Sequence, residues 1–117
     1  MVRNKELSRK LLEKIERIPE FEAKYSITYE NISINIVDME YIEIIVDIRA
    51  VDIDEFHNNS VIETAVTIFD EENTILDVQH SAFFAPSSIG LETKRIYSSF
   101  KPKYPLEDIA KIRISPT

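Results

Sequence analysis

The 117-residue chain contains no cysteine, no tryptophan and a single glycine. The absence of cysteine excludes disulfide frameworks, thiolate zinc sites and thiol nucleophiles. It is also typical of a reducing compartment, so we expect a cytoplasmic protein. One glycine is too few for a phosphate-binding loop or a dinucleotide-binding turn. The sequence therefore indicates neither thiol nor nucleotide chemistry, and we expect no cofactor.

Long apolar stretches are also absent. Residues 1–18 mix charged side chains with leucines and lack the apolar segment of a secretory signal. The longest uncharged stretch, residues 78–91, includes glutamine, histidine and proline, so it does not resemble a membrane span. The length fits one domain. We expect an N-terminal helix over residues 1–19 and a β-sandwich domain over residues 20–117.

The charge is acidic and unevenly distributed. The chain carries 14 Lys+Arg and 21 Asp+Glu, for a net charge of −7, and residues 19–81 hold two of the basic and fifteen of the acidic side chains. Because this charge repels phosphate, we expect no nucleic-acid partner. Two interpretations of the acidic segment stay open, a solvated surface that aids solubility and a surface that binds a basic partner.

Residues 4–18 have the apolar spacing of an amphipathic helix. Asn4 is a candidate N-cap and Pro19 ends the helix, since a residue before proline avoids helical geometry. Such an apolar stripe must be buried, either against the same domain or against a second chain. Its members are Leu7, Leu11, Leu12, Ile15 and Ile18.

From Phe21 onward the apolar period changes to two, which predicts strands. The phase shifts by one residue at Glu30-Asn31, and this indicates a bulge or turn. Residues 70–73 predict a hairpin loop in which Asn73 takes a positive φ. No crossover helix follows any strand, so we expect antiparallel sheets in a sandwich or barrel. The strands are expected near residues 21–29, 32–37, 41–51, 62–69, 75–84, 91–100 and 110–114.

Three segments are similar to those of a known family. Residues 66–73, Val-Thr-Ile-Phe-Asp-Glu-Glu-Asn, resemble the strand of that family that runs into an aromatic-Asp turn. Residues 74–77 resemble its returning strand, and residues 109–114 resemble its terminal strand. On these segments the stretch from Ile42 to Ser115 resembles bacterial immunoglobulin-like sandwich domains of the FxLYD type, although Asn73 stands where that family usually has glycine. The resemblance implies an antiparallel immunoglobulin-like β-sandwich of about six or seven strands, here with one N-terminal amphipathic helix. It also implies a binding or accessory role without catalytic residues.

The best candidate metal ligands lie in residues 52–59. Asp52, Asp54, Glu55 and His57 supply carboxylates and an imidazole, and an oxygen-rich loop suits calcium. The EF-hand template fails because its sixth position is not glycine. We favour solvated loop side chains and predict no metal.

His80 is expected on the same strand face as Val78 and Ala82, as a core or edge histidine bonded to backbone or to a tyrosine hydroxyl. A catalytic histidine needs a neighbouring nucleophile, and strand alternation points Ser81 to the opposite face. We therefore predict no catalytic residue. The tyrosines Tyr25, Tyr29, Tyr41 and Tyr97 are expected to fill the core, with a ligand-stacking platform as the alternative. The basic residues Lys94, Arg95, Lys101 and Lys103 are expected to pair with the acidic segment, either of the same chain or of another subunit.

Three functions follow in order of preference. The first is a non-enzymatic protein-interaction or accessory module that contacts a protein partner or itself, with a homodimer as the simplest form and no membrane contact. The second is an acidic inhibitor or immunity-like protein that masks a basic partner. The third is a small hydrolase or isomerase that uses His57 or His80 with a carboxylate.

Overall fold

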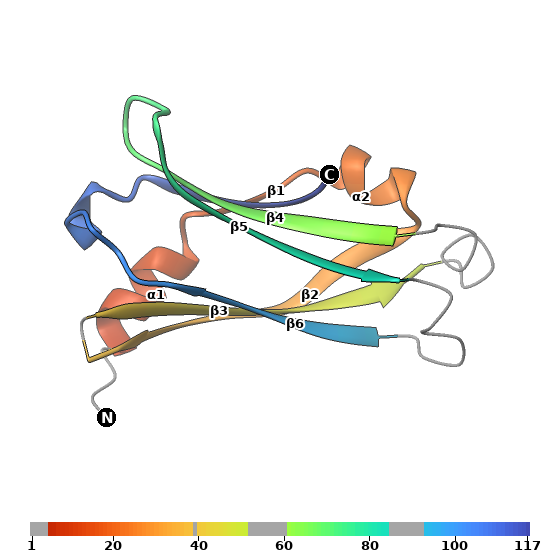
Figure 1. Ribbon diagram of the computed structural model, residues 1–117, viewed down its shortest axis with the longest axis horizontal. Helices are drawn as coiled ribbons and strands as arrows, with labels where there is room; N and C mark the ends of the chain where they lie inside the picture. Colours follow the sequence, from red (N-terminus) through yellow and green to blue (C-terminus); the bar gives the residue numbers. More distant parts are fainter. Residues whose placement is uncertain (1–4, 39, 52–60, 85–92) are drawn as a thin grey trace.

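The computed structural model describes residues 5–38, 40–51, 61–84 and 93–117. Within these residues seven strands form two sheets that lie in two layers (Figure 1). One sheet has the strand order β1-β7-β4-β5 and the other β2-β3-β6. The prediction of a mainly-β chain is confirmed, and the layers have a sandwich-like arrangement. In chain order the elements are α1 (Lys5–Leu12), β1 (Ile15–Arg17), α2 (Pro19–Lys24), β2 (Ile27–Val37), β3 (Tyr41–Ala50), β4 (Val61–Phe69), β5 (Ile75–Phe84), β6 (Thr93–Phe100), a 3-10 helix (Leu106–Asp108) and β7 (Lys111–Pro116).

The core lies between the two sheets and is built largely from isoleucine. β-Branched side chains suit the pleated, half-buried surface of a strand. The Tyr29 hydroxyl on β2 lies 2.8 Å from Thr64 Oγ1 on β4, so this hydrogen bond joins the two sheets across the core. The largest fully buried side chains are Tyr29, Phe100, Leu11, Ile27, Ile36, Ile42, Ile44, Ile48, Ile62, Ile68, Ile109 and Ile112.

The N-terminal helix is shorter than predicted. α1 ends at Leu12, and Ile15–Arg17 form β1, which pairs in parallel with β7. β1 forms because it satisfies backbone groups at the edge of β7. The Ile112 N–H of β7 donates a hydrogen bond to the Lys14 carbonyl at 3.0 Å. The prediction of a helix over residues 4–18 is therefore wrong.

The division of the chain also changes. Because β1 belongs to the four-stranded sheet, residues 1–19 do not form a helical segment separate from a sandwich over residues 20–117. The predicted apolar stripe packs within the same chain. Leu11 is 1% exposed in the core, and Leu7 and Ile15 pack against it. The candidate N-cap Asn4 lies outside the described residues.

A second helix replaces the start of the first predicted strand. The alternation from Phe21 predicted a strand over residues 21–29, yet α2 occupies Pro19–Lys24 and β2 begins at Ile27. Proline at the first helical turn and acidic residues next to it favour a helix start. Phe21 is 47% exposed, so it does not face the core as its place in the alternation indicated. Among the described residues, two helices precede β2 where one was predicted.

The phase shift in β2 is a β-bulge, as predicted. The register of β2 against β3 shifts between Glu30 and Ser33, so that Asn31 and Ile32 lie opposite a single residue of β3. Asn31 has φ 52°, in the left-handed region that asparagine tolerates. The prediction for the β4–β5 hairpin is also confirmed, because Asn73 has φ 62°. With one glycine in the chain, asparagines supply the left-handed backbone at both places.

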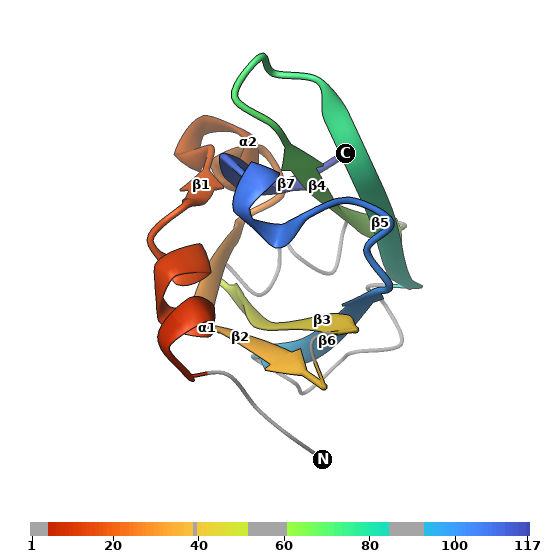
Figure 2. The same ribbon diagram turned by 90° about the vertical axis from the view of Figure 1, so that its left-hand side faces the viewer.

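The two open sides of the layers differ. α1 and α2 lie on one side, next to β2 and β1, while β5 and β6 lie on the opposite side (Figure 2). On the helical side the Ile36 N–H donates to Ser8 Oγ at 3.2 Å, so α1 satisfies part of the edge of β2. β5 and β6 are the terminal strands of their sheets, and in the described part of the chain neither helix lies over them. Within the described residues the β5–β6 side therefore consists of two terminal strands that contact each other and have no helix over them.

Candidate functional site

The four candidate metal ligands, Asp52, Asp54, Glu55 and His57, lie outside the described residues. Among the residues that the structure describes, no group of three or more histidine or acidic side chains is placed to hold a metal ion. The prediction that the protein binds no metal stays a prediction.

His80 lies on the outer face of the four-stranded sheet. Its Nδ1 is 2.8 Å from Glu63 Oε1 on β4, and the two side chains are 54% and 41% exposed. It is an edge histidine as predicted, but its partner is a carboxylate and not backbone or a tyrosine hydroxyl. Ser81 pairs with the buried Thr64 on the inner face, so alternation does keep it away from His80. The structure thus places an imidazole–carboxylate pair on an open surface, with the neighbouring serine turned away from it.

The apolar residues of β5 share this outer face with His80. Val78 is 40% exposed, Ala82 is exposed, and Ile75 at the start of the strand is 59% exposed. Val78 and Ala82 share a face with His80, as predicted, and this face is the outer one. Leu76 does pack against the core, close to the register irregularity between Ile68 and Phe69.

The inner positions of β5 are polar. Asp77, Gln79 and Ser81 lie opposite Ile68, Val66 and Thr64 of β4. Tertiary pairing explains the inversion, because the core-facing residues of β4 determine which residues of β5 face inward once the register is set. Between Asp77 and Ala82, strand β5 therefore has polar residues opposite the core-facing residues of β4, while Val78 and Ala82 lie beside His80 on the outer face.

The open edge of β5 is partly blocked by its own side chain. The Val78 N–H donates a hydrogen bond to Asp77 Oδ1 at 2.9 Å. The Val78 N–H therefore points away from β4, and it is already hydrogen-bonded to the Asp77 carboxylate. Charged residues on an edge strand oppose pairing with the edge of another molecule.

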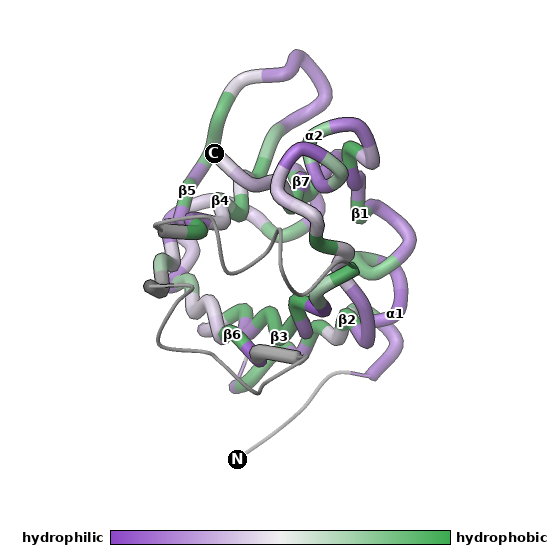
Figure 3. Tube along the Cα trace, turned by 90° about the vertical axis from the view of Figure 1, so that its right-hand side faces the viewer, coloured by the Kyte–Doolittle hydropathy of each residue, from purple (hydrophilic) through white to green (hydrophobic). Residues whose placement is uncertain are grey.

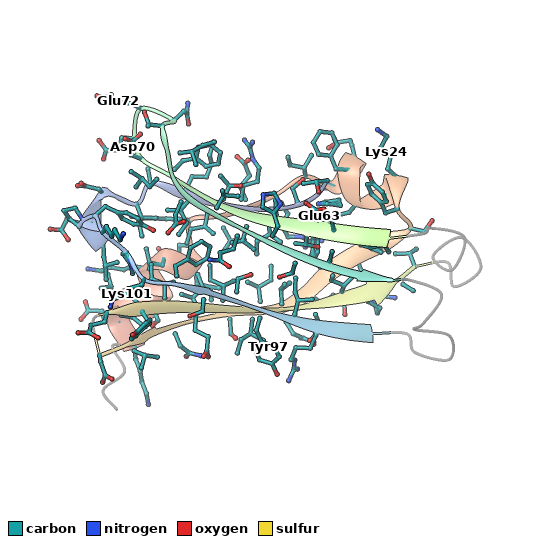
Figure 4. The ribbon with its side chains drawn as sticks, viewed as in Figure 1. Lys24, Glu63, Asp70, Glu72, Tyr97 and Lys101 are labelled. Carbon is teal, nitrogen blue, oxygen red and sulfur yellow. The ribbon has the colours of Figure 1, made fainter. Side chains whose placement is uncertain are left out.

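An acidic corner lies at the β4–β5 hairpin, where Figure 4 places Asp70 and Glu72 together. The hairpin is hydrophilic along its length (Figure 3). Asp70 Oδ1 accepts the N–H groups of Glu72 and Thr74 at 2.9 Å each, which fixes the turn. Five carboxylates line an open depression of about 300 Å³: Asp70, Glu71, Glu72, Glu107 and Asp108.

The basic C-terminal group pairs with the acidic segment through Arg95, as predicted. Arg95 Nε donates to Asp47 Oδ1 at 2.8 Å, and Asn31 Nδ2 donates to Asp47 Oδ2 at 3.0 Å. These hydrogen bonds, from Arg95 first, hold the pKa of Asp47 below its ordinary value. Lys101 instead lies over the Tyr41 ring, with Nζ 5.8 Å from the centroid.

The four tyrosines do not form a platform. Tyr29 is buried in the core, and the Tyr25 hydroxyl donates to the Thr117 carbonyl at 3.2 Å. Tyr41 and Tyr97 are 39% and 63% exposed, and Tyr97 points away from the upper layer (Figure 4). The prediction that tyrosines fill the core is thus confirmed for Tyr29 and for Tyr25, which packs against the core, and wrong for Tyr41 and Tyr97.

Sequence reasoning missed a groove between α1 and β2. Residues 5, 8, 9 and 12 recur at the spacing of one helix face, and they face the strand just after the bulge. Those two signals, the helix spacing and the phase shift, are visible in the sequence, but only the packing of α1 beside β2 brings them together. The groove has a volume of about 300 Å³ and is lined by Lys5, Ser8, Arg9, Leu12, Ile32, Ser33, Ile34 and Asn35.

Comparison with family models, with curated proteins and with solved structures found no match for this chain. Neither α1 nor α2, nor any other helix of the described residues, is long and apolar enough to cross a membrane.

Proposed function

We propose that the protein is a non-enzymatic protein-interaction module that self-associates through the outer face of β5. The observation that carries the proposal is the inverted β5 strand. Ile75 and Val78 are 59% and 40% exposed, while Asp77, Gln79 and Ser81 of the same strand lie opposite the core-facing residues of β4. Apolar side chains gathered on an open sheet face are a feature of association surfaces. A second copy is the simplest partner that presents a matching apolar face.

The proposed contact is face to face and not edge to edge. Asp77 Oδ1 already accepts the Val78 N–H at the open edge, so a second strand could not pair there without displacing the carboxylate. The outer face carries no such obstacle at Val78 and Ala82, and these two side chains lie on the same face as the His80–Glu63 pair. We therefore assign the contact to the outer face, with the edge kept closed by Asp77.

Light scattering coupled to size-exclusion chromatography tests this contact over a range of protein concentrations. We expect the wild-type mass to rise towards a dimer with concentration and Val78→Lys to stay monomeric, because a charge on the face would lose its solvation in the contact. Val51→Lys is the matched control, since Val51 is 63% exposed at the end of β3. A wild-type protein that remains a monomer at high concentration, or equal effects of the two substitutions, contradicts the proposal.

We also propose an immunoglobulin-like topology of the FxLYD type for the sandwich. It is supported by the pairing of β6 with β3 and of β7 with β4, which corresponds to the pairing of strand E with B and of F with C in immunoglobulin domains. The hairpin at residues 70–73 lies where the family resemblance expects a turn. One feature differs, because β1 lies beside β7 in parallel at the place of strand G. An experimental structure that shows another strand order would contradict the assignment.

The acidic corner favours a second candidate function, an inhibitor or immunity-like protein that masks a basic partner. Asp70, Glu71, Glu72, Glu107 and Asp108 gather there from the hairpin and from the 3-10 helix. Complementary charge accelerates association and gives it a strong salt dependence.

A lysine-rich peptide is a suitable probe of the acidic corner, with binding followed by fluorescence anisotropy at low and high salt. Here we expect the double variant Glu71→Gln, Glu72→Gln to bind more weakly than the control Glu13→Gln, Glu20→Gln, which removes the same charge from exposed positions elsewhere. Binding that does not change with salt, or that both double variants weaken equally, argues against this function.

A further inference from the structure

We propose that the groove between α1 and β2 binds a small aliphatic carboxylate. The two elements that line the groove, α1 and β2, lie on the helical side of the sandwich, and β5 and β6 lie on the opposite side (Figure 2). The groove is therefore independent of the proposed self-association. Its volume of about 300 Å³ is at the lower end for small-molecule sites, which favours a short ligand over a large cofactor.

The floor of the groove is apolar because of the bulge in β2. Asn31 and Ile32 are the two residues that oppose one residue of β3, and a bulge redirects side chains from the regular alternation. Ile32 is half-buried and lines the groove. Leu12 lies across from it at the end of α1 and is 40% exposed. These two side chains can cover an aliphatic tail, and burying that tail supplies the apolar part of the binding energy.

The rim of the groove is cationic and unpaired. Lys5 and Arg9 line the groove from successive turns of α1, and within the described part of the chain neither forms an ion pair. Lys10, the next residue along the helix, does not line the groove and pairs with Glu6 at 3.8 Å. The positive charge available to a ligand is therefore directed at the groove, and it selects an anion.

The backbone of β2 adds a donor between the rim and the floor. The Ile36 N–H donates to Ser8 Oγ, which shows that this N–H points away from β3 and towards α1. Alternate residues of an edge strand direct their N–H groups to the same side, so the Ile34 N–H is directed to the groove as well. A carboxylate held by that N–H and by Arg9 makes charge-assisted hydrogen bonds, which are shorter and stronger than neutral ones. Cations at the rim, an edge N–H and an apolar floor together match the two ends of an aliphatic carboxylate.

Octanoate is a suitable probe. Octanol and octylamine are the comparison compounds, because they have the same chain length and a different charge. We expect titration of the ¹⁵N-labelled protein with octanoate to shift the Ile34 and Ile32 amide signals in a saturable way. Octanol should bind more weakly and octylamine should leave these signals in place. Octanol binding equal to octanoate, or octanoate shifts that do not saturate at these two amides, would overturn the proposal.

Two charge variants of α1 give a matched comparison. Arg9→Gln and Lys10→Gln each remove one positive charge from exposed, adjacent positions, so their general electrostatic effects are alike. We expect Arg9→Gln to weaken octanoate binding about threefold to fivefold, the effect of one partly exposed ion pair, and Lys10→Gln to leave it unchanged. Equal weakening by both variants would show that octanoate senses only the net charge of the helix. That result would refute the groove as a binding site, and it would do so whether or not the protein self-associates.

Discussion

Arg17 and Glu22 form a two-point ion pair that joins the N-terminal segment to the rest of the protein. Arg17 Nη2 lies 2.6 Å from Glu22 Oε1 and Nε lies 3.2 Å from Oε2, and Glu22 is 2% exposed. The same Oε1 accepts the Tyr29 N–H at 3.1 Å. The pair raises the pKa of Arg17 above its ordinary value, chiefly through the hydrogen bond. One carboxylate on α2 thus connects β1 with β2.

Replacing this carboxylate should destabilise the fold. In Glu22→Ala the Tyr29 N–H loses its acceptor and Arg17 loses its partner, so we expect a loss of about 2 kcal/mol in the free energy of unfolding. Urea unfolding followed by circular dichroism measures the change. Glu20→Ala, which removes an exposed carboxylate from the same helix, should have an effect near zero. Similar midpoints for the two variants would mean that the buried pair contributes nothing.

The hydrogen bond between the sheets should contribute measurably to stability. Tyr29→Phe removes the hydroxyl that lies 2.8 Å from Thr64 Oγ1 and leaves a buried threonine hydroxyl without that partner. We expect a loss of about 1–2 kcal/mol in the free energy of unfolding, determined by urea titration. A double-mutant cycle with Thr64→Val should return a coupling energy of the same sign, and additive effects would contradict a direct bond.

Replacing Tyr104 by phenylalanine should stabilise the protein, in contrast to the same replacement at Tyr29. The Tyr104 hydroxyl is buried and has no hydrogen-bond partner among the described residues. Tyr104→Phe removes a polar group that folding strips of water, so we expect a gain of up to about 1 kcal/mol in the free energy of unfolding. Thermal unfolding of Tyr104→Phe beside Tyr29→Phe compares the two hydroxyls directly, and destabilisation by Tyr104→Phe would indicate a partner for its hydroxyl.

The buried tyrosines should make the protein sensitive to alkali. Burial, with a smaller contribution from Asp77, raises the pKa of Tyr104 to about 12, and burial also raises the pKa of Tyr29. The unfolded chain releases these protons near pH 10 while the folded protein keeps them. The contribution to stability is therefore complete below about pH 10 and is lost as the pH rises towards about 12. Urea midpoints measured over this range should fall less steeply for Tyr104→Phe than for the wild type, and parallel curves would contradict the assignment.

The edge of β5 should depend on Asp77. In Asp77→Ala the Val78 N–H loses its acceptor and the open edge loses a charge, so we expect more edge-to-edge association. Light scattering at constant concentration over several hours should show larger particles for Asp77→Ala than for the wild type. Asp77→Asn keeps a side-chain oxygen for the N–H, so it should be intermediate. If Asp77→Ala scatters no more than the wild type, the carboxylate does not protect the edge.

The sequence by itself determined the features that are written into local alternation. The apolar period of two predicted the strands from Ile27 onward, its phase shift predicted the bulge at Asn31, and the polar run before Ile75 predicted the hairpin with Asn73 in the left-handed region. These features follow from neighbouring residues, because side chains of a strand alternate between faces and asparagine tolerates a positive φ.

Only the tertiary structure decided whether an ambiguous segment became helix or strand, and which face of a strand turned inward. Ile15 fits a helix stripe, yet it lies in β1 because β7 offers an edge to pair with. The apolar side of β5 faces outward because its pairing with β4 fixes the inner face at Gln79 and Ser81. The groove beside Ile32 exists because α1 packs against the edge of β2. The partner of β1 is about one hundred residues away in the chain, while the partner of β5 is the neighbouring strand of the same hairpin. In each case the outcome depends on how two elements pack or pair, and the periodicity of one element alone carries no information about that.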